Sequence, residues 1–360
     1  MISPRPRLHS PVAEGGGMKL LKRLTQATGV PGYEGPVRRV IVEAIRPHVD
    51  SVEVDALGNV IAHKIGKGPV VAIAGHMDEI GFLVSHIEEA SGFLRIQPLG
   101  GFDPVTLVAQ RVDVHAAGGD LMGCIGRKPI HILTDEEKKK PIDLADLFID
   151  VGLPAEEVAS RVAVGDVVTM HQDFLAYGDV VSGKAIDDRL GVYVAIEALK
   201  RAKKIACDLY VVATSQEEVG VRGAQVAGHR IAPDISIALD VCIAADMPGV
   251  PEKDQVSQLR GGVAISLKDA RSISHPALVR AFRALAEKRK ISYQVTLATR
   301  GGTDAGGLQL AGDGSAAITL SIPTRYVHSV VETVHVEAID AAVALVAAFL
   351  ETANKVDLAG

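Results

Sequence analysis

The sequence predicts an α/β protein in which a mixed, largely parallel sheet is flanked by helices and the chain is interrupted by a small inserted all-β domain. Continuous apolar runs, typical of strands buried in a parallel sheet, occupy residues 69–75, 208–214, 235–241 and 314–322. Helical patterns separate these runs. From about residue 85 to residue 178 the pattern changes to short alternating segments with many glycines, as in small all-β domains.

The same change of pattern predicts the domain organisation. Residues 18–86 and 179–360 are expected to form the α/β domain, and residues 87–178 the inserted β domain. Residues 1–17 carry arginines, prolines and three consecutive glycines without an apolar stretch, so they do not look like a secretory signal. We expect them to be a disordered extension, a mis-assigned start or a remnant of expression. The charged run 135–141 is expected to be a solvated surface loop.

Local patterns predict the remaining elements. Gly58-Asn59 is a typical hairpin turn, and Pro276 is tolerated in the first turn of a helix. Beyond the four apolar strands we expect two helices around a loop within residues 18–48, strands at 52–55 and 60–62, a helix beginning near Asp187, and helices at 276–289 and 336–353.

Composition excludes several function classes. The 360 residues are 48% apolar and 23% charged, which is usual for a soluble globular protein. A net charge of −6 argues against a nucleic-acid partner. The longest apolar run, 341–350, is well short of the roughly 20 residues that a bilayer requires, so no membrane partner is expected. Three widely spaced cysteines fit a reducing, cytoplasmic location and argue against disulfides or a thiolate zinc site.

Two adjacent carboxylates follow one of the apolar strands. Glu217 and Glu218 come shortly after the run Leu209–Val212, and the nearest basic side chain in the sequence is Arg222. Carboxylates at the end of a buried strand are costly to desolvate unless a positive charge pairs with them. A metal cation is therefore favoured as their partner.

Other candidate ligands follow the other predicted strands or open the predicted helix. In open α/β sheets, sites lie outside the carboxyl ends of the strands, so these side chains are expected to converge although the sequence scatters them. They are His76 and Asp78 after strand 69–75, Asp187 after residues 180–184, Asp240 at the end of strand 235–241, and His328 after strand 314–322.

Histidines and carboxylates without cysteine suit Zn, Co or Mn. The set holds more anionic ligands than one catalytic ion takes, so two ions that share a carboxylate fit better. Asp78 is expected to orient His76, because a metal-bound histidine usually donates its other ring N–H to a carboxylate. Glu217 and Glu218 point in different directions in an extended segment, so one can bind metal while the other acts as a general base.

Several segments together resemble the M42 family of metallo-aminopeptidases, in the family's order and approximate spacing. The resemblance covers nearly everything after Met18. It rests on residues 74–81, 183–189, 215–220, 239–241, 300–306 and 328–329.

The resemblance implies a zinc-peptidase-like fold and the removal of N-terminal amino acids from short peptides. One divalent ion would be held by His76 and Asp240 and the other by Glu218 and His328, with Asp187 bridging. Glu217 would be the general base, and Asp78 would orient His76. The inserted domain would be a PDZ-like dimerisation domain, and dimers would assemble into a tetrahedral dodecamer. Thr303 and Asp304 are expected near the substrate, although they could also cap a turn.

Other functions remain open at this point. An amidase or deacylase could use the same two-metal core on non-peptide substrates. A glycoside hydrolase needs only two carboxyl groups about the scissile bond, which leaves His76 and His328 without a role. A metal-binding assembly protein without catalysis would leave Glu217 without a task. Neither the preferred N-terminal residue nor the native metal follows from the sequence.

Overall fold

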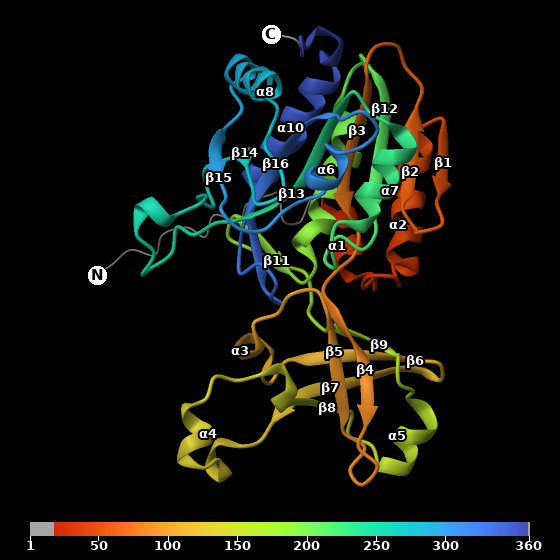
Figure 1. Ribbon diagram of the computed structural model, residues 1–360, viewed down its shortest axis with the longest axis vertical. Coiled ribbons are helices and arrows are strands. Elements are labelled where there is room, and N and C mark those ends of the chain that lie inside the picture. The colour runs from red at the N-terminus through yellow and green to blue at the C-terminus, as the bar shows by residue number, and fades with distance from the viewer. Residues whose placement is uncertain (1–17, 359–360) are drawn as a thin grey trace, which may run out of the picture.

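The computed structural model describes residues 18–358 and shows two bodies, an α/β body and a β-barrel below it (Figure 1). The α/β body is built on one mixed sheet, which over the described residues has the strand order β1-β2-β12-β3-β13-β16-β17-β11-β10, with β14 and β15 added beside β16. The strands are β1 Ser51–Val54, β2 Val60–Lys64, β3 Val70–His76, β10 Leu175–Tyr177, β11 Val180–Gly183, β12 Asp208–Thr214, β13 Ile235–Ile243, β14 Val263–Lys268, β15 Tyr293–Leu297, β16 Ala316–Arg325 and β17 Glu332–His335.

The centre of the sheet is parallel. β3 lies between β12 and β13, and β13 pairs with β16, all in parallel. The outer strands β1, β2, β17, β11 and β10 pair antiparallel. The four central strands correspond to the four apolar runs of the sequence, so the mixed, largely parallel sheet is confirmed. Both their faces are covered, which is why these runs are continuous rather than alternating.

Helices cover both faces of the sheet. Val71 and Ile73 of β3 belong to the larger core, which also contains residues of five helices: α1 Lys19–Gln26, α2 Gly35–Ile45, α6 Ile186–Arg201, α8 Pro276–Arg289 and α10 Val336–Leu350. Ala74 points to the opposite face, where it packs with α7 (Arg222–Ile231) and α9 (Ala305–Leu308). The predicted helices at 276–289 and near the C-terminal end are confirmed. No helix of residues 18–358 is long and apolar enough to cross a bilayer.

The lower body is a closed barrel of strands in the order β4-β5-β8-β7-β6-β9. Alternate residues such as Phe82, Val112, Val114 and Ile149 fill its core. The chain enters it directly after β3 and returns to the sheet at β10. Its elements are β4 Gly81–Ile87, β5 Leu94–Leu99, α3 Pro104–Leu107, β6 Arg111–Ala116, β7 Gly119–Arg127, α4 Asp135–Lys139, β8 Leu147–Asp150, α5 Ala155–Arg161 and β9 Val167–Met170.

The charged run 135–141 differs from the expected loop, because it contains the short helix α4. The Thr134 hydroxyl accepts the Glu137 N–H, and the Glu137 carboxylate accepts the Thr134 N–H, which together form a capping box. The expectation that this run lies on the surface holds, since no residue of α4 is buried. The expectations for residues 1–17 lie outside the described residues, and the domain boundaries stay predictions.

Candidate metal centre and active site

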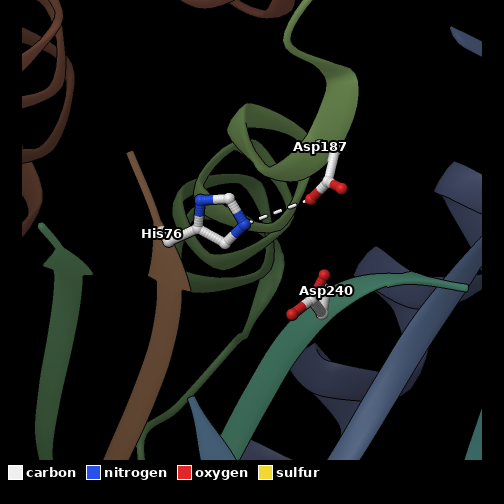
Figure 2. Close-up of side chains that lie close together, drawn as sticks. All are labelled: His76, Asp187 and Asp240. Atoms are coloured by element: carbon white, nitrogen blue, oxygen red, sulfur yellow. Dashed lines mark hydrogen bonds and ion pairs between the residues drawn. The ribbon is translucent and has the colours of Figure 1, made fainter. Parts of the chain in front are cut away.

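The carboxyl edge of the parallel strands brings three of the candidate ligands together. His76 is the last residue of β3, and Asp240 lies near the end of the neighbouring β13. Asp187, at the start of α6, reaches the same place. Figure 2 shows the three side chains pointing toward one another, with the His76 Nε2 atom 3.1 Å from the Asp187 Oδ1 atom. One potential ligand atom from each of the three lies within 4.8 Å of the others.

A second group shares Asp187 and adds residues from two more segments. The His328 Nε2 atom lies 3.3 Å from the Asp187 Oδ2 atom and 3.4 Å from the Glu218 Oε1 atom. Potential ligand atoms of Asp187, Glu218 and His328 also lie within 4.8 Å of one another. The two oxygens of Asp187 thus face two different histidines. The structure brings together all five residues that the resemblance names as ligands.

The protonation pattern of His76 fits a cation. Its Nδ1 atom lies 3.1 Å from the backbone oxygen of Asp78, which can only accept, so Nδ1 carries the hydrogen. The Nε2 atom of a neutral ring is then an acceptor, and it faces the carboxylate oxygen of Asp187. Two acceptors in contact repel unless a cation or a proton lies between them. A neutral imidazole with its other nitrogen tied to an oxygen is the usual form of a metal-bound histidine.

Burial and mutual repulsion perturb the carboxylates at this site. Burial, together with the nearby Asp188 and Asp187, raises the pKa of Asp240 well above its usual value. Burial raises the pKa of Glu217 to about 10, with Asp240 adding to the rise and His76 opposing it. Bound cations would favour the charged forms, because they supply the opposite charge that these buried groups lack. The donor set of imidazole and carboxylate fits Zn, Co or Mn.

Asp78 contacts both His76 and the backbone of the two glutamates, whereas we expected its carboxylate to orient His76. Its carboxylate accepts the backbone N–H groups of Glu217 (3.0 Å) and Glu218 (3.1 Å). Its backbone oxygen, rather than its carboxylate, is the nearer partner of the His76 ring, since the carboxylate lies 3.6 Å from Nδ1. β3 ends at His76, so Asp78 lies in the loop that follows the strand. Asp78 therefore positions the two-glutamate turn.

Glu217 lines a cavity of about 760 Å³, and His76, Asp187, Asp240 and His328 line the same cavity. Among the residues that the structure describes, the Glu217 carboxylate has no hydrogen-bond or ion-pair partner. A free carboxylate beside the candidate ligands and open to a cavity is placed to exchange a proton with a molecule bound there.

Thr303 and Asp304 lie differently from each other. Thr303 lines the cavity, and its hydroxyl is 3.0 Å from that of Thr319. Asp304 is buried and accepts a hydrogen bond from the Thr214 hydroxyl, at the end of β12. It supports the strand end and is not among the residues that line the cavity. The role of both residues toward a substrate stays a prediction.

Glu332 is a functional candidate that sequence reasoning missed. It is 2% exposed, and its two carboxylate oxygens accept the backbone N–H groups of Asp187 (3.0 Å) and His328 (2.8 Å). It thus holds the backbones of two candidate ligands. Burial and the neighbouring Asp187 raise its pKa to about 8. The only signal in the sequence is an acidic residue inside the apolar stretch 330–334, at a position that also fits an exposed edge.

For Asp188 and Arg189 the sequence left two roles open, a surface pair or residues that help to order Asp187, and the structure shows both fully buried. The Asp188 carboxylate accepts the backbone N–H of His76 and that of Gly191, and a cis peptide bond joins Asp187 to Asp188. The fully buried Arg189 donates to the backbone oxygen of Met77 and to three backbone oxygens of the segment 24–29, and it pairs with Glu79. Arg189 thus joins the end of α1 and the loop after it to the loop that follows His76, through hydrogen bonds to both.

Comparison with known proteins identifies the family of this chain. A family model described as M42 glutamyl aminopeptidase matches residues 58–345, and a model named AMPT matches residues 17–41. The lysyl aminopeptidase of Pyrococcus furiosus is 35% identical over 345 residues, which are 94% of this chain and 98% of that protein.

Solved structures give the same result. An aminopeptidase of the archaeon Desulfurococcus kamchatkensis superimposes with a TM-score of 0.89 at 40% identity, over 93% of this chain and 94% of that one. The TET1 peptidase of Pyrococcus horikoshii, which can assemble into a tetrahedron or a large octahedral shell, has a TM-score of 0.82 at 33% identity, over 92% of this chain and 98% of that one. The chain belongs to the M42 family of metal-dependent aminopeptidases.

Proposed function

We propose that this aminopeptidase removes N-terminal amino acids from short peptides with two divalent ions per subunit, which are Zn, Co or Mn. His76 and Asp240 would hold one ion, Glu218 and His328 the other, and Asp187 both. The observation that carries the proposal is the placement of Asp187, whose two oxygens each face the Nε2 atom of a different histidine. When bound, such ions polarise the scissile carbonyl and make a water molecule acidic enough to attack it.

Glu217 would be the general base. Its unpaired carboxylate takes a proton from the attacking water, whose oxygen forms a bond to the carbonyl carbon. The peptide C–N bond then breaks, and Glu217 returns the proton to the leaving amine. The base must be ionised for the first step, and the positive charge of the loaded site favours that form. Asp78 keeps Glu217 in place through the backbone N–H that it accepts.

Metal removal and replacement of the base test the proposal together. The protein is stripped with a chelator, reloaded with Zn, Co or Mn, and assayed on aminoacyl-p-nitroanilides. Glu217→Gln should bind the ions with unchanged stoichiometry and lose most turnover, about 100-fold or more for a general base. If this variant kept its turnover, Glu217 would not be the general base. If no metal restored activity, the proposal of a catalytic two-ion centre would be refuted.

The alternatives give different results in the same assays. A glycoside hydrolase would cleave carboxymethylcellulose after chelation, because its carboxyl pair needs no metal. The pairing of both histidines with carboxylates speaks against it, since that chemistry gives the histidines no task. An amidase or deacylase on the same core would be metal-dependent but would prefer N-acyl substrates to those with a free α-amino group.

We also propose that the barrel is a PDZ-like dimerisation domain and that dimers build a tetrahedral dodecamer in the cytoplasm. The likeness to the Pyrococcus horikoshii peptidase, which can assemble into a tetrahedron or a large octahedral shell, supports this. Cys124, Cys207 and Cys242 are all free thiols, which fits a reducing compartment. Light scattering coupled to size-exclusion chromatography measures the assembly, and a monomer at micromolar concentration would contradict it.

A further inference from the structure

The turn that carries the general base is held by side chains from three other segments of the chain. Residues 215–218, which we call the catalytic turn, follow directly after β12. Four successive backbone N–H groups each donate to a side-chain oxygen, and they are those of Ser215, Gln216, Glu217 and Glu218. Asp78 accepts the last two. The first two go to Asn59 and Glu34, two residues that the mechanism above does not use.

Glu34 reaches the catalytic turn from the start of α2. It is fully buried, and its Oε1 atom accepts the N–H of Gln216 at 3.2 Å and that of Gly32 at 2.8 Å. Glu34 is the N-cap residue of α2, yet its side chain makes no capping hydrogen bond to that helix, all of which the structure describes. Its Oε2 atom is buried without a hydrogen-bond partner among the described residues. The side chain of Glu34 therefore serves the catalytic turn rather than its own helix.

Asn59 reaches the catalytic turn from the hairpin between β1 and β2. Because β2 pairs with β12, the residue that precedes β2 lies beside the end of β12. The Asn59 Oδ1 atom accepts the Ser215 N–H at 2.9 Å. The Asn59 Nδ2 atom donates to the Asp55 carboxylate at 2.7 Å and to the Gly223 backbone oxygen at 3.1 Å. Both of these partners are acceptors, so the amide group of Asn59 is fixed with its oxygen toward the catalytic turn.

The backbone of Gln216 has a conformation that requires such support. Its φ angle is +56°, in the left-handed region that a residue other than glycine adopts only at a cost. A conformation of this kind persists where the surrounding structure holds it. The hydrogen bonds from Asn59 and Glu34 hold the backbone as it enters this bend, and those from Asp78 hold it afterwards. The direction of the Glu217 side chain, which follows the bend, thus depends on all three.

We propose that Glu34 and Asn59 are positioning residues of the reaction, which keep the Glu217 carboxylate where it takes the proton of the attacking water. The proposal rests on the aminopeptidase function above, with Glu217 as the general base. Neither positioning residue is among those that line the cavity, so both act through the backbone of the catalytic turn. A displaced general base slows the chemical step while the substrate contacts stay in place, so the effect falls on kcat rather than on KM.

Steady-state kinetics of the metal-loaded full chain on aminoacyl-p-nitroanilides test the proposal. Glu34→Ala removes the acceptor, and Glu34→Asp draws it back by one methylene group. Glu34→Gln keeps one oxygen, which is sufficient because a single atom, Oε1, accepts both N–H groups. Asn59→Ala removes the acceptor of the Ser215 N–H. Glu43→Ala is the control, because it removes a carboxylate from the same helix at an exposed residue, whose ion pair with Arg23 lies at the surface.

We expect Glu34→Ala, Glu34→Asp and Asn59→Ala each to lower kcat about 10- to 100-fold, with KM within about twofold of the wild type and an unchanged number of bound ions. Glu34→Gln should recover most of the loss. A double variant shows whether Glu34 acts through Glu217, because the effects of residues that act as a unit do not add. In the Glu217→Gln background, Glu34→Ala should lower kcat by less than about threefold.

Three results would overturn the proposal for Glu34. They are an unchanged kcat in Glu34→Ala and Glu34→Asp, a loss in Glu34→Gln as large as in Glu34→Ala, and an undiminished loss in the Glu217→Gln background. An unchanged kcat in Asn59→Ala would overturn it for that residue. Circular dichroism checks the fold of each variant, and if Glu34→Ala does not fold, Glu34→Asp takes its place in every comparison.

Failure of the proposed function gives different results. A wild-type protein that cleaves no aminoacyl-p-nitroanilide with any of the metals would reject the aminopeptidase function. Full turnover in Glu217→Gln would reject the base. Both results are obtained without a change at Glu34 or Asn59, so they can be told apart from a failure of the positioning role.

Discussion

Replacement of Glu332 by Gln tests whether a buried carboxylate outside the ligand set holds the metal centre together. Both oxygens of Glu332 are used, one by the Asp187 N–H and one by the His328 N–H. Gln has nearly the same shape but only one oxygen. Its NH₂ group must therefore face one of these two N–H donors, which leaves a buried donor opposite a donor.

The size of the effect follows from the two contacts. Burial raises the pKa of Glu332 to about 8, so in the metal-free protein near pH 7 its carboxyl group is largely neutral. A hydrogen bond between neutral groups contributes about 0.5–1.5 kcal/mol, and a buried donor without a partner costs about 1–3 kcal/mol. We therefore expect Glu332→Gln to lower the free energy of unfolding by about 2 kcal/mol. Loss of a group that orients metal ligands typically weakens metal binding about 10- to 100-fold, and we expect a decrease in that range.

Isothermal titration calorimetry of the stripped protein with Mn or Zn measures the affinity, and thermal unfolding followed by circular dichroism measures the stability. Glu337→Gln is the matched control, since it makes the same chemical change at an exposed residue in the first turn of α10. Metal affinity within twofold of the wild type, with an unchanged melting temperature, would refute the idea that Glu332 orients the two ligands.

Two further predictions concern the stability of the fold rather than metal binding. Arg189→Met should lower the free energy of unfolding by about 3–5 kcal/mol, because it leaves buried backbone oxygens and Glu79 without their donor. The control Arg46→Met, at an exposed position, should change the free energy of unfolding little. Equal melting temperatures of the two variants would contradict the prediction. The Arg260 guanidinium, with His335, lowers the pKa of the half-exposed Asp179 to about 2 against the opposing effect of burial. A lowered pKa stabilises the fold above the ordinary value near 4, and this contribution is lost as the pH falls toward 2. Arg260→Gln should therefore melt slightly lower than the wild type at pH 7, by a margin that shrinks between pH 4 and pH 2, and a margin independent of pH would contradict the pairing.

The central sheet and the meeting of the candidate ligands could be predicted because both depend on local signals. An apolar run identifies a buried strand, and an ionisable residue at its end identifies a side chain at the sheet edge. His76 and Glu217 were found in this way, and the family assignment from the same segments is confirmed. These patterns can be recognised in a single sequence because each one is contained in a continuous stretch of about ten residues.

The supporting residues could not be predicted, because their partners are backbone groups that carry no sequence signal. Arg189 donates to the oxygen of Leu24, which precedes it by 165 residues. Glu332 accepts an N–H from Asp187, which is 145 residues away. For Asp78 the residue was predicted but the partners of its carboxylate were not, since these are the backbone N–H groups of Glu217 and Glu218, which lie 139 and 140 residues away.

The way in which the chain passes between its two bodies has a mechanical consequence. β3 ends at His76 and β4 begins at Gly81, while the chain leaves the barrel after β9 at Met170 and enters the sheet again at β10 with Leu175. The first of these two connections to the barrel thus begins at a candidate ligand and contains Asp78. A load on the barrel, such as the docking of another subunit, would act directly on the His76 end of β3 through this short connection.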